Sequence, residues 1–262
     1  MFDRNQPDRY QAPGQPQGAP YGPLPGTTPP GTVIINGQRV SAVPREGFLT
    51  MAFVWMFVAL LVSAVSAYFV FASPAVQSFV LGAYLPLILG ELALVFIISL
   101  GINRLGAIPA LGLLFVYALL NGLTIGAIVL VYVAAGATSA VVSSFVGASA
   151  IFGAAALFGF VTKRDLSSLG GILTVGVIGL IVMSFVQLFF FGGNDTFSLI
   201  IGIAGVVIFT GLTVYWVQQL KNGELNGVRD AQAASVLGAL TLYILFINLF
   251  LSLLRVFGGG RD

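Results

Sequence analysis

Residues 79–101 read FVLGAYLPLILGELALVFIISLG, and Glu91 is the only charged side chain among them. This stretch is one of seven long apolar runs between Gly47 and Phe257, and Glu91 is the only acidic residue inside any of the seven. About 20 apolar residues are enough to cross a hydrocarbon core of about 30 Å as an α-helix. The sequence therefore predicts an all-α, polytopic membrane protein with a bundle of seven transmembrane helices.

The composition agrees with a membrane protein and excludes several functions. Hydrophobic residues make up 58% of the chain and charged residues 8%, whereas charged residues form about a quarter of a typical soluble domain. The chain has no cysteine, which rules out disulfides and thiolate metal sites, and no histidine, the commonest metal ligand. We therefore expect no cofactor and no metal site. Since the basic residues form no patch, we expect the lipid bilayer, and not nucleic acid, as the partner.

The chain is predicted to have three parts. Residues 1–46 hold nine of the twelve prolines, which predicts a disordered, Pro/Gln/Gly-rich tail. Within this tail, the Asn36-Gly37 pair is a hairpin signal, although an isolated two-stranded hairpin is only marginally stable in water. Residues 47–258 form the membrane domain, and residues 259–262 form a short C-terminal tail. The predicted spans are, approximately, 48–72, 79–101, 108–133, 138–161, 169–191, 197–219 and 232–257, joined by short loops in an up-and-down bundle.

Lysine and arginine are concentrated in alternate connections between the spans. They precede span one and follow spans two, four and six: Arg4, Arg9, Arg39, Arg45, Arg104, Lys163, Arg164, Lys221 and Arg229. The other three loops contain neither residue. Cytoplasmic loops are enriched in lysine and arginine, so we predict a cytoplasmic N-terminus and an external C-terminus.

Pro86 and Glu91 lie together in the predicted second span. A proline clashes with the carbonyl group four residues earlier, here that of Gly82, which predicts a kink or break in the helix. Interrupted helices beside a polar group mark many transport sites. No cation is placed to neutralise Glu91, since Arg104 is about 20 Å further along the helix, and Arg255 is predicted at the outer end of span seven whereas Glu91 is predicted at mid-depth or on the cytoplasmic side. The alternative is that Glu91 is protonated, hydrogen-bonded and has only a packing role.

Small residues at a spacing of four also occur within the spans. Gly122 and Gly126 form a G-x-x-x-G pattern, which allows neighbouring helices to approach closely. In a bundle of seven helices this pattern favours packing inside the protein over a dimer interface.

The chain lacks residues that three classes of intramembrane enzyme or pigment protein require. Residues 147–150 resemble the serine motif of rhomboid-type intramembrane proteases, but the chain has no histidine to accept the serine proton. An aspartyl intramembrane protease needs two aspartates within the spans, and the predicted spans contain none. A retinal Schiff base needs a lysine in the bundle, yet Lys163 and Lys221 are in loops. We therefore expect no enzymatic activity.

The most specific sequence motifs lie in the C-terminal third of the chain. Residues 209–221 read FTGLTVYWVQQLK, and residues 237–255 read LGALTLYILFINLFLSLLR. Together with TKRDL at 162–166 and NGLT at 121–124, these motifs closely resemble the Bax inhibitor (TMBIM) family, of the bacterial type, over about residues 47–260.

The resemblance implies a seven-helix fold with a central last helix and a calcium-permeable, proton-sensitive leak. In the family, the pH gate of this leak is attributed to a pair of buried aspartates in spans six and seven. This chain departs from that pattern, because Trp216 and Leu245 stand at the two aspartate positions. Glu91 resembles a carboxylate that bacterial members carry in span two.

Two functions follow from the sequence. The first is a cation (calcium or proton) leak in membrane or ion homeostasis, with Glu91 in the pathway and Asn121 and Asn248 as polar lining. The second is a non-conducting regulator that binds other membrane proteins, such as a membrane-anchored AAA protease, which the resemblance implies for some members. Loss of the aspartate pair favours the regulator, whereas an unpaired Glu91 beside Pro86 favours the leak. The resemblance also implies a place in the bacterial cytoplasmic membrane.

Overall fold

The computed structural model describes residues 32–35, 38–41, 47–190, 195–222 and 231–259. The chain separates into two compact units, Met1–Ala42 and Val43–Asp262. In the first unit, β1 (Thr32–Ile35) and β2 (Gln38–Ser41) pair in antiparallel fashion, with Val33 opposite Val40. At these residues the hairpin signalled by the Asn-Gly pair is present. The rest of the tail predicted over 1–46, and residues 260–262 of the C-terminal tail, lie outside the described residues.

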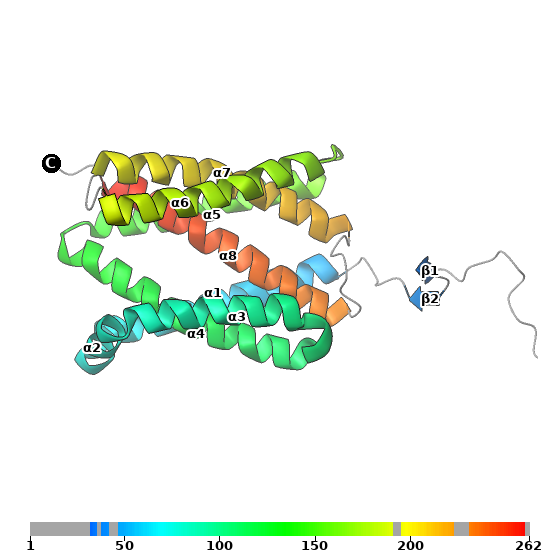
Figure 1. Ribbon diagram of the computed structural model, residues 1–262, viewed down its shortest axis with the longest axis horizontal. Helices are drawn as coiled ribbons and strands as arrows, with labels where there is room; N and C mark the ends of the chain where they lie inside the picture. The colour runs from blue at the N-terminus through cyan, green and yellow to red at the C-terminus, as the bar shows by residue number, and fades with distance from the viewer. Residues whose placement is uncertain (1–31, 36–37, 42–46, 191–194, 223–230, 260–262) are drawn as a thin grey trace, which may run out of the picture. The chain divides into compact units, whose positions relative to one another are not determined.

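The described part of the second unit consists of helices (Figure 1). They are α1 (Phe48–Ala72), α2 (Pro74–Gly82), α3 (Tyr84–Leu105), α4 (Ala107–Ala134), α5 (Thr138–Val161), α6 (Ser167–Phe190), α7 (Asp195–Asn222) and α8 (Ala231–Gly258). All of them except α2 are long and apolar enough to cross a membrane. The prediction of an all-α bundle with seven spans is therefore confirmed.

The second span begins later than the sequence predicted. Residues 79–82 belong to the short helix α2. The helix is interrupted at Ala83, and α3 begins at Tyr84. Pro86 lies in the first turn of α3, where its missing N–H group removes no helical hydrogen bond. The helix does break close to Pro86, but the break precedes the span and does not interrupt it. As a result, Glu91 lies nearer to the start of α3 than to its end.

Helix α8 is the centre of the bundle. It contacts α1, α3, α4, α5 and α7, and in Figure 1 it runs obliquely between a group formed by α1, α3 and α4 and a group formed by α5, α6 and α7. Within the most apolar part of each span, 72% of the residues are buried in α8, against 6% in α6. A helix that is apolar on all sides can fill the core of a bundle. Since α6 is at least as apolar as α8 and is far less buried, composition alone does not determine the central position of α8.

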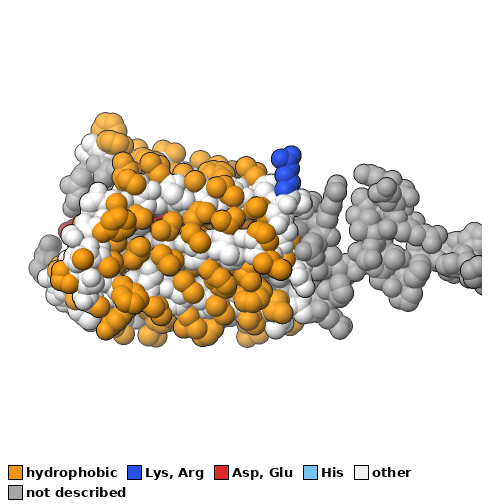
Figure 2. All heavy atoms as spheres, turned by 90° about the horizontal axis from the view of Figure 1, so that it is seen from below, with side chains coloured by type: hydrophobic (Ala, Val, Ile, Leu, Met, Phe, Trp, Pro, Cys, Tyr) orange, Lys and Arg blue, Asp and Glu red, His pale blue; other side chains and the backbone are white. Residues whose placement is uncertain are grey.

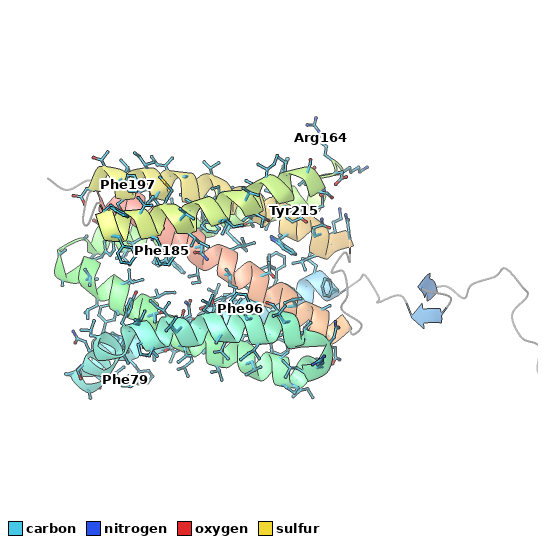
Figure 3. All side chains as sticks on the ribbon, viewed as in Figure 1. Phe79, Phe96, Arg164, Phe185, Phe197 and Tyr215 are labelled. Carbon is cyan, nitrogen blue, oxygen red and sulfur yellow. The ribbon has the colours of Figure 1, made fainter. Side chains whose placement is uncertain are left out.

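The outer surface of the bundle is apolar. In the face shown in Figure 2, hydrophobic side chains are spread along the bundle and Lys or Arg side chains appear only at one end. Phe79 of α2, Phe96 of α3 and Phe185 of α6 are each more than half exposed (Figure 3). A soluble monomer rarely exposes so large an apolar area, whereas lipid chains cover it without cost.

Glycines allow two of the close approaches between helices. Gly106 is the single residue between the end of α3 and the start of α4. Its φ of 75° is in the region that favours glycine. Gly122 and Gly126 of α4 lie against the backbone of α1, because a Cβ on either would meet backbone atoms of Ser63 or Ala67. This contact confirms the prediction that the G-x-x-x-G pattern serves packing inside the bundle.

Candidate functional site

Glu91 lies inside the bundle, where α3 faces α4. Its side chain is 9% exposed. Asn121 Nδ2 donates a hydrogen bond of 2.7 Å to Glu91 Oε2, and Thr124 Oγ1 donates one of 2.8 Å to Glu91 Oε1. Asn121 and Thr124 are three residues apart on α4, a spacing that places both on one face of a helix. Both carboxyl oxygens of Glu91 therefore have a neutral partner from α4.

The hydrogen bonds continue from Asn121 to two further helices. The hydroxyl group of Tyr243 on α8 lies 2.9 Å from Asn121 Oδ1 and 2.6 Å from Ser63 Oγ on α1. Ser63 Oγ in turn lies 2.7 Å from the backbone oxygen of Ala118 on α4. We call Glu91, Thr124, Asn121, Tyr243 and Ser63 the Glu91 network. It links α1, α3, α4 and α8 in the interior of the protein.

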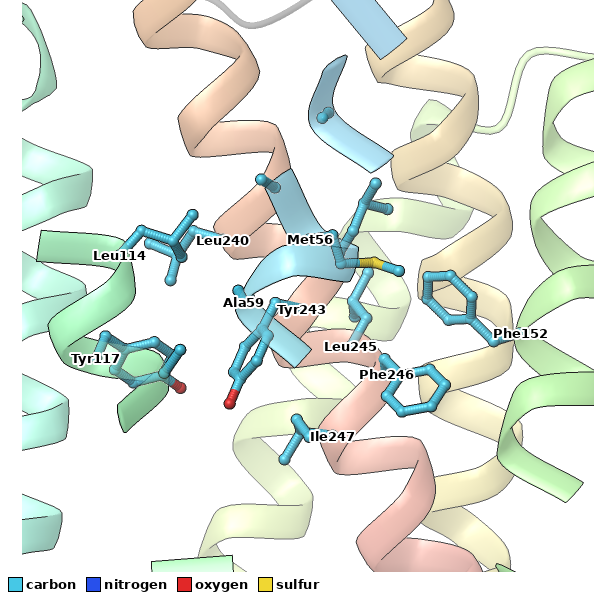
Figure 4. Close-up of a cluster of buried hydrophobic side chains, with 14 of the residues drawn as sticks. Met56, Ala59, Leu114, Tyr117, Phe152, Leu240, Tyr243, Leu245, Phe246 and Ile247 are labelled. Atoms are coloured by element: carbon cyan, nitrogen blue, oxygen red, sulfur yellow. The ribbon is translucent and has the colours of Figure 1, made fainter. Parts of the chain in front are cut away.

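The local packing explains how these short side chains reach one another. Gly122 brings α4 so close to α1 that a Cβ there would lie 2.7 Å from Ser63 Cα. This approach places the Ser63 hydroxyl within reach of both Ala118 and Tyr243. The ring of Tyr117 packs edge-on against that of Tyr243, with 5.5 Å between centroids (Figure 4). Both tyrosines are buried, so the rings shield this part of the network.

The electrostatic setting of Glu91 disfavours a negative charge. Its hydrogen-bond partners are an amide and a hydroxyl group, and the part of the chain that the structure describes supplies no ion pair to it. An unpaired charge within a membrane span is costly, and hydrogen bonds from two neutral donors offset only part of this cost. The arrangement suits a carboxyl group that binds and releases a proton.

The two asparagines predicted to line the pathway, Asn121 and Asn248, have different partners in the structure. Asn121 is a direct partner of Glu91, whereas Asn248 donates to the backbone oxygen of Ile244 in its own helix at 2.8 Å. Among the described residues, the side chain of Asn248 makes no hydrogen bond to a member of the Glu91 network. Of the two asparagines, only Asn121 is brought to the carboxyl group.

The positions assigned to the family's aspartate pair are part of the hydrophobic core. Leu245 is 4% exposed, and Trp216 is half-buried and packs against the same hydrophobic cluster, in which its ring meets that of Tyr215 edge-on. Figure 4 shows Leu245 between Met56 and Phe246. Neither side chain carries a group that binds and releases a proton.

The sequence prediction missed three members of the network, namely Ser63, Thr124 and Tyr243. The spacing of Asn121 and Thr124 on α4 could have indicated Thr124. Ser63 and Tyr243 gave no comparable signal, because their partners lie 55 residues or more away in the sequence.

The described residues contain no group of three or more His, Cys, Asp or Glu side chains that could hold a metal ion. Calcium takes 6–8 oxygen ligands, several of them carboxylates. Glu91 alone offers two carboxyl oxygens, and both already accept hydrogen bonds. This site is therefore poorly suited to hold a bare divalent cation.

Seven apolar spans, a central last helix and a buried carboxyl group joined to polar side chains define a polytopic membrane protein with an internal polar site. Residues 45–262 match the family model described as inhibitor of apoptosis-promoting Bax1. The chain belongs to this Bax inhibitor-like family of integral membrane proteins.

Similar proteins are found in several bacteria. The inner membrane protein YbhL of Escherichia coli strain K12 is 40% identical over 232 residues, which cover 83% of this chain and 95% of YbhL. An uncharacterized protein of Deinococcus radiodurans is 41% identical over 218 residues, covering 82% of this chain and 91% of that protein. An uncharacterized protein of Borreliella burgdorferi is 33% identical over 234 residues, covering 87% and 98%.

Proposed function

We propose that the protein is a cation leak, that the proton is the cation it carries best, and that Glu91 is the group that carries it. The observation that supports this proposal is the buried carboxyl group at one end of a series of hydrogen-bonding side chains across four helices. Carboxyl groups within spans mark proton relays in many membrane proteins. The proposal assigns the protein no enzymatic activity.

Calcium is the weaker choice of cation. A calcium ion at Glu91 would have to replace the hydrogen bonds from Asn121 and Thr124 and find most of its ligands elsewhere. The described residues around Glu91 offer no second carboxylate for this purpose. A proton needs a single oxygen and leaves the packing unchanged.

The proposed location is the bacterial cytoplasmic membrane, with a cytoplasmic N-terminus. The name of the similar protein YbhL, an inner membrane protein, supports this membrane. The orientation rests on the lysine and arginine residues of alternate loops.

Ion flux into liposomes tests the leak. Purified wild type and Glu91→Gln are reconstituted at equal protein content, with a pH-sensitive or a calcium-sensitive dye inside. Glutamine keeps the shape of the side chain but cannot bind and release a proton at neutral pH, so we expect proton flux to fall sharply while the protein stays folded. Glu91→Leu would be less informative, because it also leaves Asn121 and Thr124 without their acceptor.

The matched control is Asp195→Asn, which removes an exposed carboxylate in the first turn of α7 and should not change proton flux. Equal and appreciable flux in wild type and Glu91→Gln would exclude Glu91 from the pathway. Calcium flux that disappears in Glu91→Gln while proton flux is retained would reverse the choice of cation.

One observation favours the second function, a non-conducting regulator that binds other membrane proteins. Among the described residues, α6 contacts only α7 and leaves apolar side chains such as Ile172, Val175 and Phe189 exposed. Such a face could pack against a span of another membrane protein, for example a membrane-anchored AAA protease. Absence of flux in wild type, together with cross-links from α6 to another membrane protein in cells, would favour the regulator over the leak.

A further inference from the structure

The hydroxyl groups of the Glu91 network carry too few protons for the contacts that they make. Three oxygen–oxygen contacts run in series from Asn121 Oδ1 through Tyr243 and Ser63 to the backbone oxygen of Ala118, at 2.9, 2.6 and 2.7 Å. At these distances each contact needs one hydrogen atom between its two oxygens.

Tyr243 and Ser63 each supply only one proton. One of the three contacts therefore lacks a hydrogen atom whichever way the two hydroxyl groups turn. The backbone oxygen of Ala59, 3.1 Å from Ser63 Oγ, can only share the Ser63 proton and does not relieve the shortage.

Rotation of the Asn121 amide group by 180° removes this shortage. The nitrogen and oxygen of the amide then exchange places without moving any other heavy atom. Nδ2 now donates to the Tyr243 hydroxyl, Tyr243 donates to Ser63, and Ser63 donates to Ala118. Each of the three contacts has one hydrogen atom.

The rotated amide changes what Glu91 must be. Its Oδ1 now faces Glu91 Oε2 across the contact of 2.7 Å. Two oxygens at this distance need a hydrogen atom between them, and only the carboxyl group of Glu91 can supply it. Every contact from Glu91 Oε2 to the backbone oxygen of Ala118 therefore has its hydrogen atom only when Glu91 is protonated. The single proton of Thr124 is shared between Glu91 Oε1 and the backbone oxygen of Asn121, 3.0 Å away, in both positions of the amide, so it does not favour either one.

We propose that Glu91 is protonated in the resting protein and that the Asn121 amide is a two-position switch, which couples the proton on Glu91 to the direction of the hydrogen bonds as far as Ser63. When Glu91 loses its proton, the amide turns so that Nδ2 donates to the carboxylate and Tyr243 donates to Oδ1. One contact among Tyr243, Ser63 and Ala118 then has no proton, which disfavours the ionised form.

The surroundings of Glu91 agree with a neutral resting state. Its ionisable neighbours are tyrosine hydroxyls on three helices, Tyr84 on α3, Tyr117 on α4 and Tyr243 on α8. Helix α2, which also packs against α3, contains no ionisable side chain. Tyrosine hydroxyls are uncharged at neutral pH, so none of these elements stabilises a carboxylate by opposite charge.

The switch deepens the proposed function, and its role in the cell rests on that function: one proton on Glu91 would set the direction of the hydrogen bonds from Asn121 to Ser63. The experiment that tests the switch measures the protonation of Glu91 and not ion flux. A protein that conducts nothing could still have the switch, and a leak could exist without it.

Infrared spectroscopy of the full chain in lipid, recorded over a series of pH values, tests the resting state. We expect wild type at neutral pH to show the C=O stretching band of a protonated carboxylic acid. This band should be absent in Glu91→Gln and unchanged in the control Asp195→Asn. A band at neutral pH that is unaffected by Glu91→Gln, or no band at all, would overturn the proposal.

Two substitutions that do not touch Glu91 test the coupling. Ser63→Ala and Tyr243→Phe each remove one hydroxyl oxygen from the series. When Glu91 is ionised, the remaining oxygen–oxygen contacts then all have a hydrogen atom, so the ionised form is no longer disfavoured by a contact without a proton. We expect the acid band to disappear at a pH lower by about one unit than in wild type, because an unsatisfied buried contact corresponds to roughly one such unit. The control Ser144→Ala removes a buried hydroxyl that bonds only its own helix, at Ala140, and should leave this pH unchanged. The same pH for all three variants would show that no switch couples Ser63 to Glu91.

Discussion

Gly122 shows at the scale of one residue how a missing side chain positions the site. A Cβ at this position would meet the backbone of Ser63 and would lie 2.8 Å from Ser66 Cβ. Because the obstructing atoms include backbone, they cannot move aside as the end of a flexible side chain can. The hydrogen bonds from Ser63 to Ala118 and from Ser66 to Leu119 depend on this approach.

We predict that Gly122→Ala lowers the free energy of unfolding by about 1–3 kcal/mol, the usual cost of overpacking. Thermal unfolding in detergent measures this change. The control is Gly112→Ala in the same helix, where a Cβ would meet nothing within 4 Å, so stability should be equal or higher. Equal losses in both variants would show that the close approach of Gly122 to Ser63 is not the cause of the effect.

At the scale of elements, the loop between α5 and α6 is fixed to α7 by one side chain. Gln218 is 7% exposed; its Oε1 accepts from the N–H of Leu166 at 3.2 Å, and its Nε2 donates to the backbone oxygen of Arg164 at 2.6 Å. Figure 3 shows Arg164 at the end of the bundle.

Hydrogen bonds from Ser167 lower the pKa of the exposed Asp165 carboxyl in the same loop. The contact between Asp165 and Ser167 is therefore kept at neutral pH and is lost only when the pH falls through that lowered pKa.

We expect Gln218→Leu to lower the free energy of unfolding by about 1–3 kcal/mol, because buried backbone groups of the loop lose their partner. Hydrogen exchange at Leu166 should become faster, since its N–H group is then free. The control in the same helix is Thr210→Val, which removes a buried hydroxyl that has no hydrogen-bond partner and should be neutral or stabilising. Unchanged exchange at Leu166 in the Gln218 variant would show that other contacts hold the loop.

At the scale of the whole molecule, seven spans put the two ends of the membrane domain on opposite sides of the bilayer. The connections that follow spans two, four and six carry the lysine and arginine residues. The loop between α5 and α6, which follows span four, should therefore be cytoplasmic, and the connection between α6 and α7 should be external.

A topology reporter tests this orientation. Fusion after Asp165 should give a cytoplasmic signal, and fusion near Asn194 should give an external one. The opposite pair of signals would invert the orientation of the bundle without changing its fold.

The class of fold is predictable from the amino-acid sequence alone, because the length and apolarity of a span are local properties. The sequence predicted α1 and α5 to the residue and the other spans to within a few residues, apart from the start of α3. That boundary was missed because residues 79–82 are as apolar as the span they precede. The sequence also identified Glu91 as the one acidic residue within the predicted spans, since a single charge in an apolar run needs no partner to be noticed.

The contacts of Glu91 could not be predicted without the folded structure. Asn121 and Asn248 are equivalent in the sequence, as amides within apolar helices, yet only Asn121 faces the carboxyl group. The choice depends on the rotation of each helix about its axis and on the approach of α1 to α4 at Gly122. Both result from the packing of many side chains between helices that are distant in the chain. For this reason the joining of Tyr243 and Ser63 to Glu91 became visible only in the folded bundle.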